Sequence, residues 1–145
     1  MIPITSILAI MQHSFENDFA FYGIEGNIVH IVYKPGLEID LAAAIQIVKD
    51  RITFQEELPY PVLCDIRQLR RVDKPARNYL ALEGSVLVKA LAFVIEPPVT
   101  DAMTQFYFRT NNPSLPTGTY RKMEEAIEFL KKYLVIVALI ASIPF

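Results

Sequence analysis

The chain has 145 residues, of which 52% are hydrophobic and 21% charged, so it has enough apolar surface to fold as one domain and is not expected to be disordered. Its formal net charge of -2 at pH 7 provides no overall attraction to nucleic acid or to an anionic membrane. The single cysteine, Cys64, excludes an internal disulfide, and His13 and His30 are too few to complete a metal cluster with it. We therefore expect a cytoplasmic protein with no metal, no cofactor and no nucleic-acid partner.

The ends of the chain are apolar and set the expected domain boundaries. The N-terminal segment, residues 1–18, has no Asp, Glu, Lys or Arg between positions 2 and 15, but Pro3 interrupts it and no basic residues precede an unbroken apolar run. A secretion signal is therefore not expected. We place one domain at residues 19–133 and an apolar tail at residues 134–145.

The C-terminal tail follows Lys131 and Lys132 and belongs to a stretch, residues 133–145, without Asp, Glu, Lys or Arg. As a helix this stretch would be about 20 Å long, which is short of the roughly 30 Å of a bilayer core. We expect the tail to cover an apolar face of its own domain or of a second subunit. Insertion into a membrane surface, helped by the two lysines, is the alternative interpretation.

The domain begins with a predicted hairpin. Aromatic and β-branched residues at 19–24 and 28–33 predict two antiparallel strands around residues 25–27, where Gly26 supplies the positive φ that a tight turn requires. Asp40 is then placed to cap a helix. The apolar residues expected on one face of that helix are Leu41, Ala44, Ile45, Val48 and Ile52.

The rest of the domain alternates between strands and helices. Apolar residues at 62–66 predict a buried strand parallel to the preceding one, and Asp73 follows as the cap of a second helix. Residues 90–95 predict the next strand, and Thr100 caps a third helix that ends at residues 111–113. The residues of the second helix that are expected to face inward are Ala76, Tyr79 and Leu80.

A brief strand at residues 115–119 precedes the last helix, whose expected buried residues are Met123, Ala126, Ile127 and Leu130. The order of elements predicts a single α/β domain with a mixed five-stranded sheet and about four helices, in which an antiparallel hairpin precedes parallel strands. Sites in such sheets lie beyond the carboxyl ends of the parallel strands, here residues 68–73 and 96–100.

Basic side chains gather at the first of these edges, on both sides of a predicted helix N-terminus. Helix N-termini favour anions, and arginine adds bidentate recognition of phosphate or carboxylate. The edge is therefore our candidate for binding an anionic group of a partner. The alternative is a solvated cluster paired with Asp65, Asp73 and nearby glutamates. The candidate binding residues are Arg67, Arg70, Arg71, Asp73, Lys74 and Arg77.

No catalytic residues are expected. The five glycines are scattered and form no phosphate-binding loop. Cys64 lies within an apolar strand, which favours a buried and inert thiol, and His30 alternates with Ile28 and Val32, which favours a structural role. Because no nucleophile and base can be paired, we expect a protein that is not an enzyme.

Two stretches of the chain resemble the SpoIIAA-like branch of the STAS proteins, and the similarity extends over residues 19–133. The first stretch is PVLCDIR at residues 61–67. The second is TYRKMEEAIEFL at residues 119–130, which is similar to the Glu-Ala-x-x-Trp/Phe-Leu pattern of the family's final helix. The resemblance implies a STAS-like fold and a non-enzymatic interaction domain, as in the antagonists of anti-sigma factors.

The resemblance does not extend to a phosphorylation switch. In those antagonists a partner kinase phosphorylates a serine within an Asp-Ser-Ser/Thr-Gly-like run, and the corresponding run here is DKPA at residues 73–76. Asp73 matches this pattern, but Lys74 and Pro75 carry no hydroxyl. Ser85 lies too far along the chain to replace the missing serine, so the chain is an atypical member without the phosphoacceptor.

Three interpretations of function follow from the sequence. The first is a regulatory module that contacts another protein through residues 68–77 and the adjoining helix, and that forms a homodimer because of its apolar tail and open sheet edge. The second is a carrier or sensor of a small apolar or anionic ligand, since the STAS-like fold also resembles the Sec14-type lipid-carrier domain. The third is a peripheral membrane protein attached by its tail.

Overall fold

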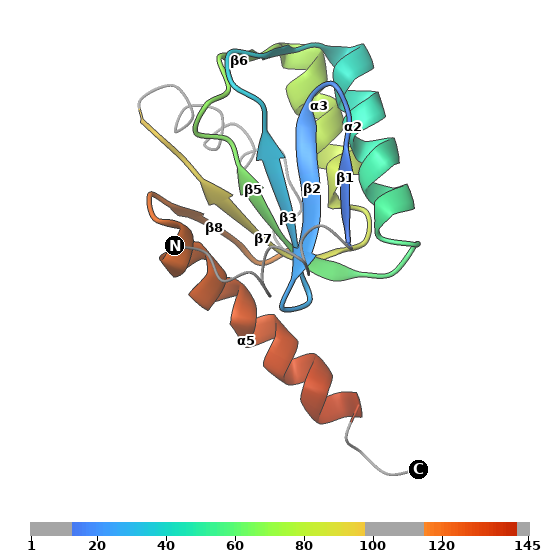
Figure 1. Cartoon of the computed structure of the whole chain (residues 1–145), viewed down its shortest axis with the longest axis vertical. Coiled ribbons are helices and arrows are strands. Elements are labelled where there is room, and N and C mark those ends of the chain that lie inside the picture. Colours follow the sequence, from blue (N-terminus) through green and yellow to red (C-terminus); the bar gives the residue numbers. More distant parts are fainter. Residues whose placement is uncertain (1–12, 98–114, 142–145) are drawn as a thin grey trace.

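The centre of the fold is a six-stranded mixed sheet (Figure 1). The computed structural model describes residues 13–97 and 115–141, with side chains through residue 134. Strands β1 to β3 are antiparallel, whereas β3, β5, β7 and β8 are parallel, as the sequence predicted for the hairpin and the strands after it. The strands, in their spatial order, are β1 (Ser14–Glu16), β2 (Ala20–Glu25), β3 (Ile28–Tyr33), β5 (Tyr60–Asp65), β7 (Val88–Val94) and β8 (Thr117–Tyr120).

Three helices and a separate pair of strands complete the described part of the chain. The helices are α2 (Leu41–Phe54), α3 (Lys74–Leu82) and α5 (Met123–Ala141), and a short 3-10 helix, η1 (Glu83–Ser85), follows α3. The pair consists of β4 (Glu38–Ile39) and β6 (Arg71–Val72). The sequence predicted neither this pair nor β1, because strands of two or three residues are too short to show an alternating pattern. The third predicted helix, which begins at Thr100, lies outside the described residues.

Local signals in the sequence set the hairpin turn and two helix starts. Gly26 and Asn27 both adopt positive φ, +58° and +62°, which matches the twist of a tight hairpin. Asp40 and Asp73 each accept a hydrogen bond from the backbone amide three residues further on, at 2.8 and 2.9 Å. The predicted turn and both predicted caps are therefore confirmed.

The face that α2 buries differs from the predicted one. Ala44 and Val48 are buried as expected, but Leu41 and Ile45 point outward with 41% and 42% of their surface exposed. Apolar residues occupy more than one side of this helix, so their spacing alone does not select the buried side; the side with two adjacent alanines packs against the sheet and α3. The residues that α2 buries are Ala43, Ala44, Ile47, Val48 and Arg51.

Helix α5 covers the opposite face of the sheet from α2 and α3 (Figure 1). Ala126 and Leu130 are fully buried against the strands, and Met123 and Ile127 are half-buried, which confirms the predicted stripe. The helix then continues to Ala141, and in Figure 1 its last turns project past the sheet. None of the helices in the described ranges has both the length and the apolar character needed to cross a membrane.

Candidate functional site

The first of the predicted anion-binding residues, Arg67, forms an ion pair with an aspartate of the same domain. Arg67 follows β5, and its Nε and Nη2 atoms donate to the Asp65 carboxylate at 2.9 and 2.8 Å. The Arg67 backbone amide donates to the same carboxylate at 3.2 Å. Hydrogen bonding to Asp65 raises the pKa of Arg67, so the guanidinium stays charged and its charge is compensated locally.

Three more of the predicted residues make contacts further along the same edge. Arg70 precedes β6 and lies 3.8 Å from the Glu38 carboxylate on β4. The Arg77 Nη1 atom donates to the backbone carbonyl of Val72 at 2.8 Å. Asp73 accepts a hydrogen bond from the first turn of α3, so its role is that of a helix cap.

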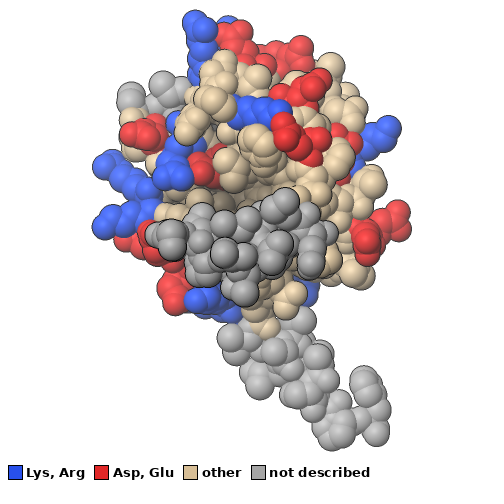
Figure 2. Space-filling model, viewed as in Figure 1, with Lys and Arg blue, Asp and Glu red and all other residues tan. Residues whose placement is uncertain are grey.

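Arg71 and Lys74 are exposed, and no ion pair within the described ranges involves either of them. Acidic and basic side chains lie next to one another at the margin of the face shown in Figure 2. Local pairing of this kind weakens the attraction of a surface for an anion. The six predicted residues thus lie along one edge, and four of them contact other residues of the same chain. The binding of an anionic group of another protein at this edge stays a prediction.

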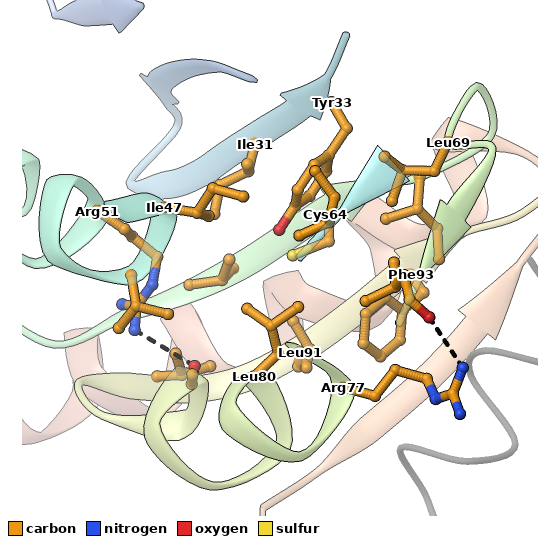
Figure 3. A pocket seen from close by; sticks show the side chains of 17 residues that line it. Ile31, Tyr33, Ile47, Arg51, Cys64, Leu69, Arg77, Leu80, Leu91 and Phe93 are labelled. Carbon is orange, nitrogen blue, oxygen red and sulfur yellow. Dashed lines mark hydrogen bonds between the residues drawn. The ribbon is translucent and has the colours of Figure 1, made fainter. Parts of the chain in front are cut away.

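A cavity of about 100 Å³ lies between the sheet and the layer formed by α2 and α3 (Figure 3). Aliphatic and aromatic side chains form most of its lining. Ile31 of β3, Val62 of β5 and Leu91 of β7 reach it from three adjacent strands, and Ile47 and Leu80 reach it from the two helices. Because side chains alternate along a strand, the neighbours of the three strand residues face α5 instead.

A buried polar network closes one end of this cavity. Arg51 of α2 is only 3% exposed, and its Nη2 atom donates to the carbonyls of Val86 at 2.8 Å and of Gly84 at 3.3 Å. Its Nη1 atom donates to the side chain of Gln55, whose own Nε2 donates to the Leu87 carbonyl at 3.1 Å. The network therefore ties the end of α2 to the turn that precedes β7, and each buried polar group in it has a partner.

Two neutral polar groups face the same cavity. Burial raises the pKa of the Tyr33 hydroxyl well above its ordinary value and raises the pKa of the Cys64 thiol to about 12. A thiol with that pKa is protonated near neutral pH and is a poor nucleophile. The other residue considered for chemistry, His30, is paired with Leu63 and lies on the α5 face, whereas Cys64 is paired with Ile31 on the cavity face.

The described residues therefore do not bring a nucleophile and a base together. Burial lowers the pKa of His30, which keeps its imidazole neutral near pH 7. Within residues 13–97 and 115–141, no group of His, Cys, Asp and Glu side chains is arranged to hold a metal ion.

Sequence reasoning missed Arg51, Gln55 and Tyr33 as polar groups of the interior. A signal for the first two is present, because they follow Ala44 and Ile47 at intervals of three to four residues and so fall on the same side of α2. A charged residue on the buried side of a helix indicates a paired interior group. Tyr33 gives no such signal, because a tyrosine at the end of a strand is as common at the surface as in the core.

Comparisons with known proteins identify the fold. A family model described as "Domain of unknown function (DUF7793)" matches residues 22–134. The chain is also similar to the crystal structure of an uncharacterized protein of the DUF3478 family with a SpoIIAA-like fold, from Shewanella loihica PV-4. The TM-score is 0.58 and the sequence identity 13%, and the match covers 80% of this chain and 98% of that one. No curated protein matches the chain. The chain thus has the SpoIIAA-like, STAS-like α/β fold that its sequence resembles.

Proposed function

The chain belongs to the family described as "Domain of unknown function (DUF7793)". We propose that it is a non-enzymatic regulatory module that forms a homodimer through helix α5. The observation that carries the proposal is the end of α5, which runs beyond the sheet it covers (Figure 1). Residues 135–141 of that end have the sequence VIVALIA, without a polar side chain. A helix that is apolar on all sides is normally buried, so we expect another protein surface to cover this end of α5.

The charges along α5 favour a second copy of the chain as that partner. Its exposed side is acidic near the start, at Glu124, Glu125 and Glu128, and basic further on, at Lys131 and Lys132. Two such helices placed antiparallel would set the acidic part of one against the basic part of the other. A contact of this kind is self-complementary, as a two-fold symmetric dimer requires.

The position of the matched family range also supports this proposal. The match ends at residue 134, and Tyr133 and Leu134, at the end of the matched range, pack against the core on the α5 face. Residues 135–141 of α5 lie outside the matched range. Their removal leaves the buried Ala126 and Leu130 in place, so that self-association can be tested separately from folding.

The homodimer can be tested by analytical ultracentrifugation of the full chain and of a chain that ends at Leu134. We expect the full chain to sediment as a dimer at micromolar concentration and the shortened chain as a monomer with an unchanged circular dichroism spectrum. A matched control is Leu82→Ser, which removes the most exposed large apolar side chain of α3, 67% exposed, and should leave the dimer intact. A full chain that is monomeric, or a shortened chain that is still dimeric, would contradict the proposal.

A charge exchange tests the antiparallel arrangement. The double variant Lys131→Glu, Lys132→Glu should be monomeric, because two acidic surfaces then face each other. Mixing it with the double variant Glu124→Lys, Glu125→Lys should restore a dimer that contains one chain of each kind. If the full chain instead binds anionic vesicles as a monomer and loses this binding when shortened, the membrane interpretation replaces the dimer.

A further inference from the structure

The cavity between the sheet and the α2/α3 layer is larger than ordinary packing defects. Protein interiors are packed at crystal-like density, and voids larger than a water molecule are few in a domain. This cavity has a volume of about 100 Å³, and its walls are set by three parallel strands and two capped helices. An engineered apolar cavity of roughly 150 Å³ in another protein stays free of water and binds benzene. The space here is smaller, so it is suited to a compact apolar molecule of at most about six heavy atoms.

The hydroxyl of Tyr33 is aimed into this apolar space. Tyr33 is 7% exposed and lines the cavity, and Figure 3 shows its hydroxyl pointing inward beside Cys64. No hydrogen bond between described residues involves the Tyr33 hydroxyl. The hydroxyl faces the open space of the cavity, so a bound molecule that accepts a hydrogen bond from it would gain a polar contact at this position. The tyrosine is thus the specific contact of an otherwise apolar site.

The two arginines at the border of the cavity argue for a neutral ligand. Arg51 directs its guanidinium to Gln55 and to the carbonyls of Gly84 and Val86. Arg77 donates to the carbonyl of Val72, on the side away from Tyr33 in Figure 3. Because hydrogen bonds to the backbone hold both groups, a ligand carboxylate would have to displace these contacts, whereas a neutral molecule would not.

We propose that this cavity binds a small, neutral, mainly apolar molecule with one hydrogen-bond acceptor, to which the Tyr33 hydroxyl donates a hydrogen bond. The walls select size and apolar character, and the tyrosine selects the acceptor. This site lies on the opposite face of the sheet from α5, so it is independent of the proposed homodimer.

The first test uses two probes of similar size, cyclopentanone and methylcyclopentane, which differ in the acceptor. We expect cyclopentanone to shift the methyl NMR signals of Ile31, Val62 and Leu91 in a saturable way. Tyr33→Phe should weaken cyclopentanone binding about three- to tenfold, as expected for the loss of one neutral hydrogen bond, and leave methylcyclopentane binding unchanged. Tyr79→Phe on α3 removes a hydroxyl outside the cavity and serves as the control.

The second test fills the space. Leu80→Trp enlarges a half-buried side chain at the cavity wall and should abolish the binding of both probes, whereas Leu82→Trp, on the exposed side of the same helix, should not. Binding of cyclopentanone that depends on both Leu80 and Tyr33 supports the proposal. It is overturned if neither probe shifts the lining methyl groups, if Leu80→Trp binds normally while folded, or if Tyr33→Phe weakens both probes equally.

Discussion

The two faces of the central sheet are packed differently, although the same strands supply both. On the α5 face, Ala90 and Ala92 of β7 and Ala126 of α5 are fully buried, and Leu130 fills the space between them. On the other face, β7 presents Leu91 and Phe93 toward two helices, and a cavity remains. Small residues let a single helix approach closely, whereas bulky residues beneath a pair of helices hold them apart.

This difference shows how one sheet can combine a closely packed side with a side that has room for a ligand. On the cavity face, side-chain hydrogen bonds hold the two helices in place in addition to apolar packing. Arg51 and Gln55 fix the end of α2 to the turn that precedes β7, and Asp40 and Asp73 cap the two helices. We therefore expect the stability of the cavity face to depend on polar contacts and that of the α5 face to depend on packing.

The largest effect is expected from Arg51→Met, which removes the centre of the polar network on the cavity face. The carbonyls of Gly84 and Val86 and the Gln55 side chain each lose a donor, so we expect the free energy of unfolding to fall by about 3 kcal/mol in urea denaturation. Lys49→Met, an exposed change on the same helix, should shift it by less than about 0.5 kcal/mol. A loss below about 1 kcal/mol for Arg51→Met would mean that the network does not hold this face together.

A pair of enlarged side chains compares the packing of the two faces directly. Ala92→Leu on the α5 face should destabilise the fold by about 2 kcal/mol, because a fully buried alanine has no space for the added atoms. Cys64→Met on the cavity face adds atoms next to an existing void and should change the free energy of unfolding by less than about 1 kcal/mol. Equal losses in the two variants, measured by urea denaturation, would show that the faces do not differ in packing.

The smallest effect is a pH dependence that arises on the cavity face. Burial raises the pKa of Cys64 from 9.0 to about 12, so between these values the unfolded chain releases a proton that the folded chain keeps. Folding stability therefore falls as pH rises, by about 1.4 kcal/mol between pH 8 and pH 10 for this group. Cys64→Val should lose less stability over that interval when both proteins are unfolded in urea. Parallel pH curves for the two proteins would refute this assignment.

The sequence was most informative where the structure is local or repeats along the chain. The hairpin around Gly26, the caps at Asp40 and Asp73, and the stripe of α5 through Leu130 were each predicted from neighbouring residues. The buried side of α2 was not, because apolar residues occupy more than one side of that helix and the sheet and α3 select among them. The candidate basic edge was found, and pairing with Asp65 was one of the two interpretations of it, but the contact of Arg70 with Glu38 was not predicted, since Glu38 lies far from Arg70 in the sequence.

The sequence by itself determined the order of the longer strands and of the three helices that the structure describes and, through its resemblance, the SpoIIAA-like fold. Propensity, capping and periodicity depend on residues close together in the chain, and these are visible in the sequence. Only the tertiary structure decided that Arg51 is buried against the turn before β7, that Arg70 lies beside Glu38, and that Tyr33 faces a cavity. A cavity is the space left between elements after they pack, so it depends on distances between residues that no local pattern encodes.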